Sequence, residues 1–348
     1  MKKRGLATAK DCQRMGLTPL ESLDLSKVKR FSDLTAALRK VSFGGRRLGE
    51  AEEVLYRMVT DPDCFVVGTF SGAMTAAKMG LLICEMIEQK MIRAVVSTGA
   101  LVTHGLIEAV GMTHFKCSPE EADDQKFYKL GLNRIYDTLE MEQNLDDLEN
   151  ILKLVFKGFN PAKKISSFEL CQKVGKYLAE NTEGRGILKS AFLHKVPVYI
   201  PAFPDSEFGL DFALYNRVQK RKRRKKILHD PFLDLEHFTK LILKQPKLGI
   251  FTIGGGVPRN WAQQVGPFTD LINKRTKDKV RVVQYHYGVR ICPEPAEWGG
   301  LSGCTYKEGI SWGKFVAPAK GGMQAEVLCD ATIAWPIILK AVLERLGR

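Results

Sequence analysis

Short, almost continuously apolar segments recur along this chain, and each has the length of a β-strand. They are rich in Val and Ile, and they lack the strict alternation of apolar and polar positions that marks a strand with one wet face. Such segments are typical of parallel strands that are covered on both faces. The segments expected to be strands are 64–70, 93–98, 196–201, 248–253, 281–286 and 325–330.

Between these segments, apolar residues recur with the spacing of an α-helix. The segments expected to be helical are 73–89, 105–111, 165–181, 232–244, 257–275 and 331–346. A regular alternation of strands and helices predicts a parallel sheet with right-handed crossover connections. We therefore expect an α/β fold built on a doubly wound, mostly parallel, Rossmann-like sheet.

The whole chain, residues 1–348, is expected to form a single domain, since 45% of its residues are hydrophobic and can bury a large core. Residues up to about 60 are expected to form helices that pack on the sheet. The region at about 113–160 is more charged and is interpreted as a helical insertion. No internal repeat or low-complexity linker divides the sequence.

The composition bears on where the protein is expected to be located and on whether it binds a metal ion. The basic N-terminus lacks the apolar run of a secretory signal, and Lys78 interrupts the most apolar region, 65–87. The eight cysteines form no CxxC pair, and the six histidines form no HExxH motif. We expect a soluble, cytoplasmic protein with free thiols and without a bound metal ion or a membrane segment.

The net charge of +14 is concentrated in one place, because eight basic residues lie between Arg217 and Lys226. Without them the net charge is about +6, which is ordinary for a domain of this size. The run can be a solvated loop or a surface extension of a helix. It can also contact RNA or another polyanion, but no aromatic residues are interleaved for base stacking, so nucleic acid is not the expected partner.

Small and polar residues follow several predicted strands. Ligands of doubly wound sheets bind at the carboxyl ends of the strands, where glycines let backbone amides approach a phosphate at a helix N-terminus. A glycine run of this kind can also be no more than a tight connection. The residues of interest here are Ser71, Thr98, Gly99, Asp205, Gly255 and Gly256, with Asp205 as a candidate to accept ribose hydroxyl hydrogen bonds.

The segment EGISWGKF, residues 308–315, places a lysine among small and apolar residues. Partial desolvation of Lys314 beside Trp312 would lower its pKa and make it a nucleophile that forms Schiff bases. Lys314 can instead be a surface lysine whose stem passes along a core tryptophan.

Segment 308–315 resembles the EAVSWGK segment of the deoxyhypusine synthase family. Four further segments resemble that family in the same order along the chain. They are RAVVSTGALVTHGLIEA (93–109), VPVYIPAFPDSEFGLD (196–211), GIFTIGGGVPRNW (249–261) and AEVLCDATIAWP (325–336).

The resemblance implies a deoxyhypusine synthase-like fold, NAD as the cofactor and a homotetramer with active sites at a dimer interface. It adds Ser302, Gly303 and Asp330 to the residues expected to bind NAD, although Asp330 can equally cap the last helix. The implied reaction moves a 4-aminobutyl group from spermidine, through an imine on Lys314, to the lysine of a translation factor precursor. Trp312 would shield that imine, and Glu308 would bind a cationic amine or relay a proton.

The chain also departs from the family pattern. The aspartates of the run before the lysine motif are replaced in 298–303, and the histidine pair after the glycine turn is Asn260-Trp261. His104 stands where the family has a glutamate, and the last aspartate of its DGSxGD region is matched by Leu210, with Asp211 one place later.

His104, Asp211 and Asn260 are the candidate substrate-binding residues. Because a polyamine cation needs carboxylates around it, two other functions stay open. One is transfer to a small diamine, as a homospermidine synthase performs it. The other is a non-catalytic protein that binds NAD or a polyanion.

Overall fold

The computed structural model describes residues 6–348, and its centre is a six-stranded sheet in which every neighbouring pair of strands is parallel. The first five residues of the N-terminal region expected to be helical lie outside the described residues. In spatial order the strands are β11 (Met323–Val327), β10 (Tyr287–Ile291), β9 (Lys247–Ile253), β1 (Cys64–Phe70), β2 (Ala94–Ser97) and β7 (Val198–Tyr199).

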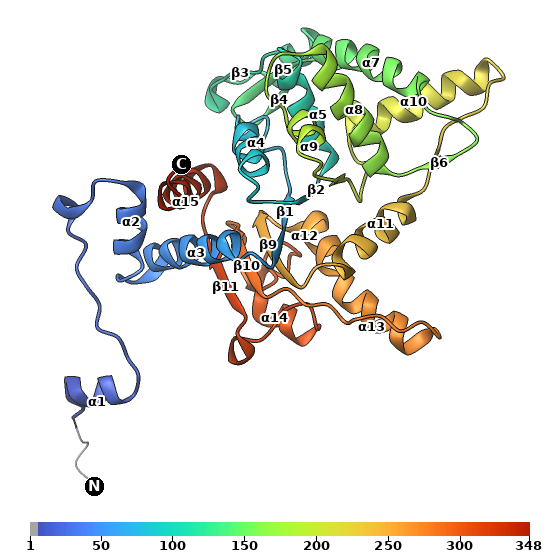
Figure 1. The fold of residues 1–348 in the computed structure, drawn as a ribbon. Coiled ribbons are helices and arrows are strands. Elements are labelled where there is room, and N and C mark those ends of the chain that lie inside the picture. Colours follow the sequence, from blue (N-terminus) through green and yellow to red (C-terminus); the bar gives the residue numbers. More distant parts are fainter. Residues whose placement is uncertain (1–5) are drawn as a thin grey trace.

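The sheet is covered on both faces, as its apolar strands predict. In β1, Val66 and Phe70 belong to one apolar cluster, whereas Phe65 and Val67 belong to another on the opposite face. On the first face lie α3 (Phe43–Thr60), α4 (Gly80–Glu88), α5 (Gly99–Ala109) and α15 (Ala331–Arg345) (Figure 1). On the second lie α11 (Pro231–Leu243), α12 (Gly256–Gln263), α13 (Val265–Arg275) and α14 (Tyr306–Ser311).

The order of the strands confirms the doubly wound fold class. The chain starts at the centre with β1, moves outward through β2 and β7, returns to β9 beside β1, and then moves the other way through β10 and β11. The direction of winding therefore reverses between β1 and β9. In folds of this class the crevice outside the carboxyl ends of the two strands at such a reversal is where ligands bind.

The predicted strands were confirmed at the centre of the sheet and less well at its edges. Segments 64–70 and 248–253 match β1 and β9 within one residue. Segment 196–201 forms only the two-residue ladder of β7, because Pro197 and Pro201 have no N–H to donate. The last strand, β11, begins and ends earlier than the predicted 325–330.

The predicted strand at 281–286 was wrong. Tyr285 pairs with the segment at Phe315, since it accepts from Val316 and donates to the carbonyl of Lys314, and the strand beside β9 is β10. The buried positions were nevertheless right, because Val283 and Tyr285 are in the core. The apolar pattern of segment 281–286 therefore predicted which residues are buried, but not which segment they pair with.

The helices α11 and α15 and helix α8 (Ser167–Asn181) match their predicted segments within two residues. Three others differ. Segment 73–89 becomes helical only at Gly80, after Lys78 takes a φ of 61°. Helix α5 begins at Gly99 instead of 105, and segment 257–275 is two helices that meet at Gln264.

The N-terminal region contains α1 (Ala9–Arg14), α2 (Phe31–Leu38) and α3. Helices α2 and α3 pack against α15, whereas α1 buries no residue and lies apart at the end of an extended segment (Figure 1).

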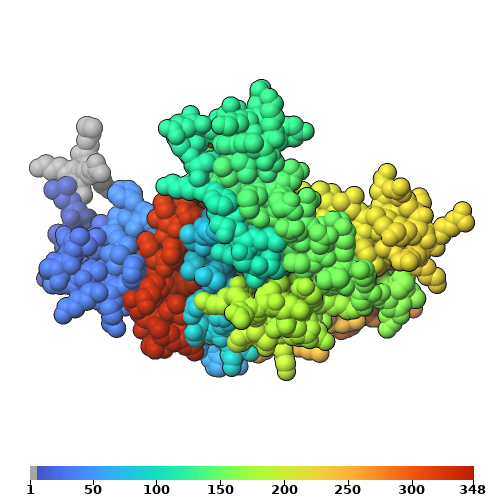
Figure 2. Space-filling model, turned by 90° about the horizontal axis from the view of Figure 1, so that it is seen from above, coloured from blue at the N-terminus to red at the C-terminus, as the bar shows by residue number. Residues whose placement is uncertain are grey.

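The region at 113–160 is not wholly helical, contrary to expectation. It contains α6 (Asp124–Lys129) and α7 (Glu142–Lys157), but also the antiparallel strands β3 (Phe115–Lys116), β4 (Leu132–Ile135) and β5 (Thr138–Met141). These strands are short and charged, so they lack the apolar run that revealed the central strands. In Figure 2 the first part of this region, coloured blue-green, stands out from the body of the molecule, whereas α7 packs against the core.

Three α-helices and one ladder lie outside the segments expected to be helical or extended. They are α9 (Ile187–Leu193), α10 (Glu207–Arg221), α14 and the pair β6 (Lys164–Ile165) and β8 (Leu228–His229). The basic run begins in the last turns of α10 and continues into the following turn, so it is both a helix extension and a loop. It projects at one end of the molecule, in yellow in Figure 2.

Candidate active site

Lys314 owes its position to the way in which α14 ends. Gly313 adopts a φ of 70°, a left-handed conformation that glycine accepts without cost. The N–H of Gly313 donates to the carbonyl of Ile310 (3.0 Å), and the N–H of Lys314 donates to that of Gly309 (2.9 Å). These two bonds form a Schellman motif. The sequence Trp-Gly-Lys is therefore a helix stop that turns Lys314 back towards the sheet.

Lys314 is a buried residue, and within the described part of the chain its ammonium group has no carboxylate partner. Only 8% of the residue is exposed, and its Nζ donates to the amide oxygen of Asn260 at 2.9 Å. Burial lowers the pKa of Lys314 below its ordinary value, and the guanidinium of Arg259 acts in the same direction. A lowered pKa enlarges the neutral fraction of the amine, which is the nucleophilic form. Lys314 is thus not the surface lysine of the alternative interpretation.

A cavity of about 260 Å³ opens beside Lys314. Among the described residues, no carboxylate lines it. The lining residues are Arg259, Asn260, Gln263, Gln264, Leu301, Cys304, Gly309, Trp312 and Lys314. Trp312 is at the rim with 68% of its surface exposed, so within one chain it forms a wall of the cavity and not a lid.

The glycine turn after β9 lies at the reversal point of the sheet. Ser71, directly after β1, accepts a hydrogen bond from the backbone N–H of Gly255 at 2.9 Å and donates to the carbonyl of Ile253. Gly254 and Gly256 have φ values of 73° and 58°, so both need the freedom of glycine. The turn leads directly into α12, and among the described residues no side chain caps the N-terminus of this helix. An uncapped helix N-terminus can receive a phosphate.

The ends of two more strands reach the same crevice. Thr98 caps α5 and donates its hydroxyl to the carbonyl of Gly72 at 2.8 Å. A Cβ at Gly99 would lie 2.2 Å from the hydroxyl of Ser206, so only glycine allows α5 and α10 to approach so closely. The exposed Asp205 precedes Ser206 and therefore lies at the same edge.

Asp330 caps α15 by accepting from the N–H of Thr332 at 2.6 Å, so the capping role is confirmed. It also lines a second cavity of about 750 Å³ together with Ala73 and Met74, which follow β1.

The segment 301–304 joins the crevice to the lysine cavity. A Cβ at Gly255 would lie 2.6 Å from the Cα of Ser302, so this segment packs on the glycine turn. Leu301 and Cys304 line the lysine cavity. Of the two residues expected to bind NAD in this segment, Ser302 lies against the glycine turn, whereas a Cβ at Gly303 would lie 2.6 Å from the carbonyl oxygen of Pro295.

Two buried arginines hold this segment and were missed from the sequence. Arg290 donates to the carbonyl oxygens of Ser302 and Cys304, and Arg259 donates to that of Cys304 at 2.7 Å. Both side chains are almost fully buried. A signal was present for Arg290, because it is a single cation inside the apolar strand β10.

Three of the six predicted catalytic and substrate-binding residues do not line the lysine cavity. Glu308 accepts from the N–H and hydroxyl of Thr305 in a capping box, and these bonds keep the pKa of its carboxyl below the ordinary value. Asp211 is buried on α10, where burial and the nearby Glu207 raise its pKa to about 7. His104 contacts Glu140 in the 113–160 region.

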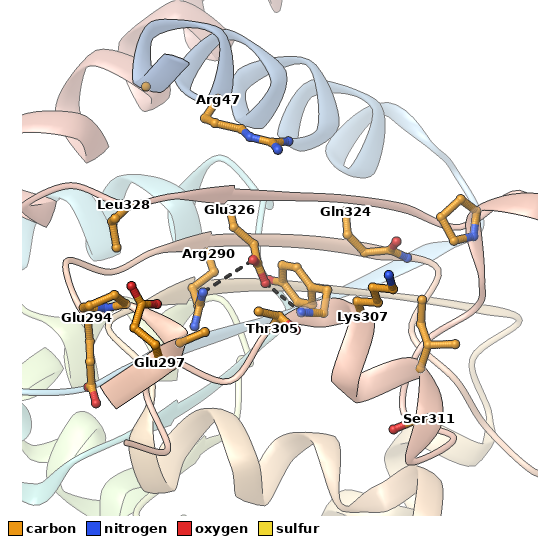
Figure 3. A pocket seen from close by; sticks show the side chains of 16 residues that line it. Arg47, Arg290, Glu294, Glu297, Thr305, Lys307, Ser311, Gln324, Glu326 and Leu328 are labelled. Atoms are coloured by element: carbon orange, nitrogen blue, oxygen red, sulfur yellow. Dashed lines mark hydrogen bonds and ion pairs between the residues drawn. The ribbon is translucent and has the colours of Figure 1, made fainter. Parts of the chain in front are cut away.

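A larger groove of about 1210 Å³ lies on the other side of α14 (Figure 3). Glu294, Glu297 and Glu326 line it, and Glu326 pairs with Arg290 at 3.5 Å while it accepts from the N–H of Tyr306 at 2.7 Å. In the described part of the chain, carboxylates therefore line this groove and not the lysine cavity, and α14 lies between the two.

The geometry defines a doubly wound α/β protein in which a glycine turn at the reversal point of the sheet lies near a buried lysine with a lowered pKa. The family model for deoxyhypusine synthase matches residues 33–342, and the chain belongs to this family, whose members are transferases.

A "Probable deoxyhypusine synthase 2" from Methanosarcina mazei is 32% identical over 329 residues, which are 94% of this chain and 90% of that protein. A protein with the same description from Archaeoglobus fulgidus is 33% identical over 302 residues, 86% of this chain and 94% of that one. The crystal structure of a "putative deoxyhypusine synthase" from Entamoeba histolytica superposes with a TM-score of 0.60 at 13% identity. That superposition covers 92% of this chain and 96% of that chain.

In the part of the chain that the structure describes, no helix combines the length and the apolar character needed to cross a membrane.

Proposed function

We propose that this protein is an NAD-dependent transferase that carries a 4-aminobutyl group from spermidine on Lys314 and passes it to an acceptor amine. The observation that carries the proposal is the buried Lys314, whose ammonium group has an amide and, among residues 6–348, no carboxylate as its partner. A structural buried lysine is normally paired with an anion, because an unpaired buried charge is costly. A lysine kept partly neutral by burial is suited to imine formation.

We infer that a dinucleotide binds at the reversal point of the sheet, and the glycine turn there supports this proposal. Backbone amides of the 254–256 turn and the N-terminus of α12 would hold the phosphates, and Asp205 would accept hydrogen bonds from a ribose. A bound NAD would supply a hydride acceptor that oxidises the substrate carbon and later returns the hydride. The 301–304 segment supports this arrangement, because it contacts both the turn and the lysine cavity.

In the transfer step the neutral Nζ of Lys314 would attack the imine carbon of the oxidised substrate and expel 1,3-diaminopropane. The amide oxygen of Asn260 accepts a hydrogen bond from the Nζ and so orients it. In the neutral amine the nitrogen lone pair would then point away from this hydrogen bond. Trp312 would exclude water from the imine on Lys314 once a second chain covers the exposed face of Trp312. We propose a homo-oligomer in which this occurs, since Trp312 and Leu301 present exposed apolar surface at the mouth of the cavity.

The acceptor is either a lysine of a translation factor precursor or a small diamine. The test is to incubate purified protein with NAD and spermidine and to measure release of 1,3-diaminopropane. Putrescine and the precursor protein are then added in separate reactions, and homospermidine or an alkylated precursor identifies the acceptor. Folded protein that binds NAD but releases no 1,3-diaminopropane would contradict the proposed function.

A further inference from the structure

Two histidines and a glutamate converge in the region that connects α5 with the small antiparallel sheet. His104 is on α5, His114 lies in the loop before β3, and Glu140 is on β5. The Oε2 of Glu140 lies 3.1 Å from the Nδ1 of His104 and 2.5 Å from the Nε2 of His114. The two ring nitrogens are 3.4 Å apart. Three donor atoms at such separations can all bind one cation.

We propose that His104, His114 and Glu140 bind a zinc-class divalent metal ion. Two imidazole nitrogens and one carboxylate oxygen are the donor set of open zinc sites and of related first-row metals, whereas Mg²⁺ and Ca²⁺ prefer oxygen ligands. In the described part of the chain this is the group of histidine, cysteine and acidic residues whose ligand atoms are close enough for one ion. The remaining coordination positions would be taken by water.

The burial of the three side chains fits an ion with one open side. Glu140 and His114 each expose 1% of their side chains, and His104 exposes 16%. His114 also lines the cavity of about 750 Å³ that reaches Asp330. Water therefore has access to the cluster from the side of His104 and this cavity.

The carboxylate of Glu140 is held in place from both of its oxygens. The buried Asn144 donates to the Oε1 of Glu140 at 2.7 Å and to the carbonyl of Thr113 at 3.2 Å. One carboxylate oxygen is thus fixed by an amide, and the other faces both imidazoles, which is the usual outer support of a metal ligand.

Lys78 occupies the far side of His114. Its Nζ lies 3.2 Å from the Nδ1 of His114 and 3.6 Å from the carboxylate of Glu108. A metal ion on Nε2 requires the ring proton on Nδ1, so Lys78 must turn away, and Glu108 is placed to receive it. Lys78 therefore competes with the metal ion, both for the ring and by its charge.

The test uses protein without a histidine tag, stripped with EDTA and dialysed against Zn²⁺, and the bound metal is measured by mass spectrometry. We expect one Zn²⁺ per chain, a visible absorption band on titration with Co²⁺, and no competition by Mg²⁺. Glu140→Gln and His104→Asn should each weaken binding at least about tenfold. The exposed His194 is the matched control, and His194→Asn should bind like the wild type.

Two further measurements distinguish metal binding by the three side chains from a purely structural role. Zn²⁺ should raise the melting temperature of the wild type and not that of Glu140→Gln, and circular dichroism confirms that both are folded. Lys78→Met should bind Zn²⁺ at least as tightly as the wild type. Folded wild type that retains no Zn²⁺, equal binding in Glu140→Gln and the wild type, or weaker binding in Lys78→Met would overturn the proposal.

Discussion

At the scale of single residues, the environment of Lys314 decides its chemistry. The residue is buried, its partner is the neutral amide of Asn260, and the guanidinium of Arg259 also disfavours the charged form. When folding lowers the pKa of a lysine, the fraction of its amine that is neutral increases at every pH below the ordinary pKa. Nucleophilic attack should therefore become faster with rising pH until it passes the lowered pKa, and then level off.

Asn260→Asp tests this environment directly. A carboxylate 2.9 Å from the Nζ would raise the pKa of Lys314, and an opposite charge at such a distance is worth about 1–3 pKa units. We expect transfer at neutral pH to fall about tenfold or more and to recover as the pH rises. Asn260→Ala, which removes the hydrogen bond without adding charge, should keep the pH profile of the wild type. An unchanged profile in Asn260→Asp would contradict the role of the amide.

Part of this site was predictable from single residues and part was not. Short sequence patterns were enough to predict Lys314, Asn260 and the glycine turn. These patterns indicate either a special backbone geometry or a polar residue at an unusual position. The cluster of His104, His114 and Glu140 has no local pattern, because its members come from a helix, a loop and a strand far apart in the sequence. Glu308 fits a sequence rule of a different kind, since Thr305 and Glu308 have the spacing of a capping box.

At the scale of elements, the site depends on how helices begin and end. The stop of α14 at Gly313 directs Lys314 inward, and the start of α12 at Gly256 supplies amides to the crevice. The strands that hold these ends were predicted where both faces are buried, as in β1. The prediction was wrong where pairing is set by a segment from elsewhere in the chain. Tyr285 was expected in a strand of the central sheet, but its backbone bonds to the segment that carries Lys314.

Gly313→Ala should destabilise the end of α14. Nothing lies within 4 Å of the added Cβ, so the cost comes from the positive φ alone and is about 1–2 kcal/mol. Chemical denaturation measures this loss, and we expect transfer activity to fall with it because Lys314 shifts. Gly313→Asn is the control, since asparagine tolerates this conformation, and it should lose less. Equal losses in both variants would show that the conformation of Gly313 is not the cause.

Gly255→Ala should disturb the crevice without unfolding the protein. The new Cβ would lie 2.6 Å from the Cα of Ser302, so the 301–304 segment must move away from the turn. Calorimetry should show NAD binding at least about tenfold weaker, which is about 1.4 kcal/mol. At Gly184 an added Cβ makes only an ordinary contact of 3.6 Å, so Gly184→Ala should bind NAD normally. Unaltered binding in Gly255→Ala would remove the turn from the cofactor site.

At the scale of the whole molecule, charge is distributed unevenly. Among the described residues, none of the eight basic side chains from Arg217 to Lys226 appears in an ion pair of 4.0 Å or less with a carboxylate, and the run projects from one end of the molecule (Figure 2). The lysine cavity and the crevice are built on the central sheet and its crossover helices. Catalysis and any contact with a polyanion should therefore be separable.

Replacement of Lys220, Lys222, Lys225 and Lys226 by glutamine tests this separation. Exposed substitutions of this kind change the free energy of unfolding by no more than about 0.5 kcal/mol each. We expect thermal stability and small-amine transfer close to those of the wild type. Retention on a heparin column should fall, and its dependence on salt should become less steep. A large loss of stability would instead show that the run is structural.

The measurement that tests the central claim most directly is a borohydride trap. Protein is incubated with NAD and spermidine labelled in its aminobutyl carbons, reduced with borohydride, and digested for mass spectrometry. The wild type should carry a reduced 4-aminobutyl adduct on Lys314. Lys320→Arg, which changes an exposed lysine nearby, should carry the same adduct. Lys314→Arg should bind NAD, fold normally and carry none, because a guanidinium stays protonated. An adduct on another lysine, or transfer that survives in Lys314→Arg, would contradict the account.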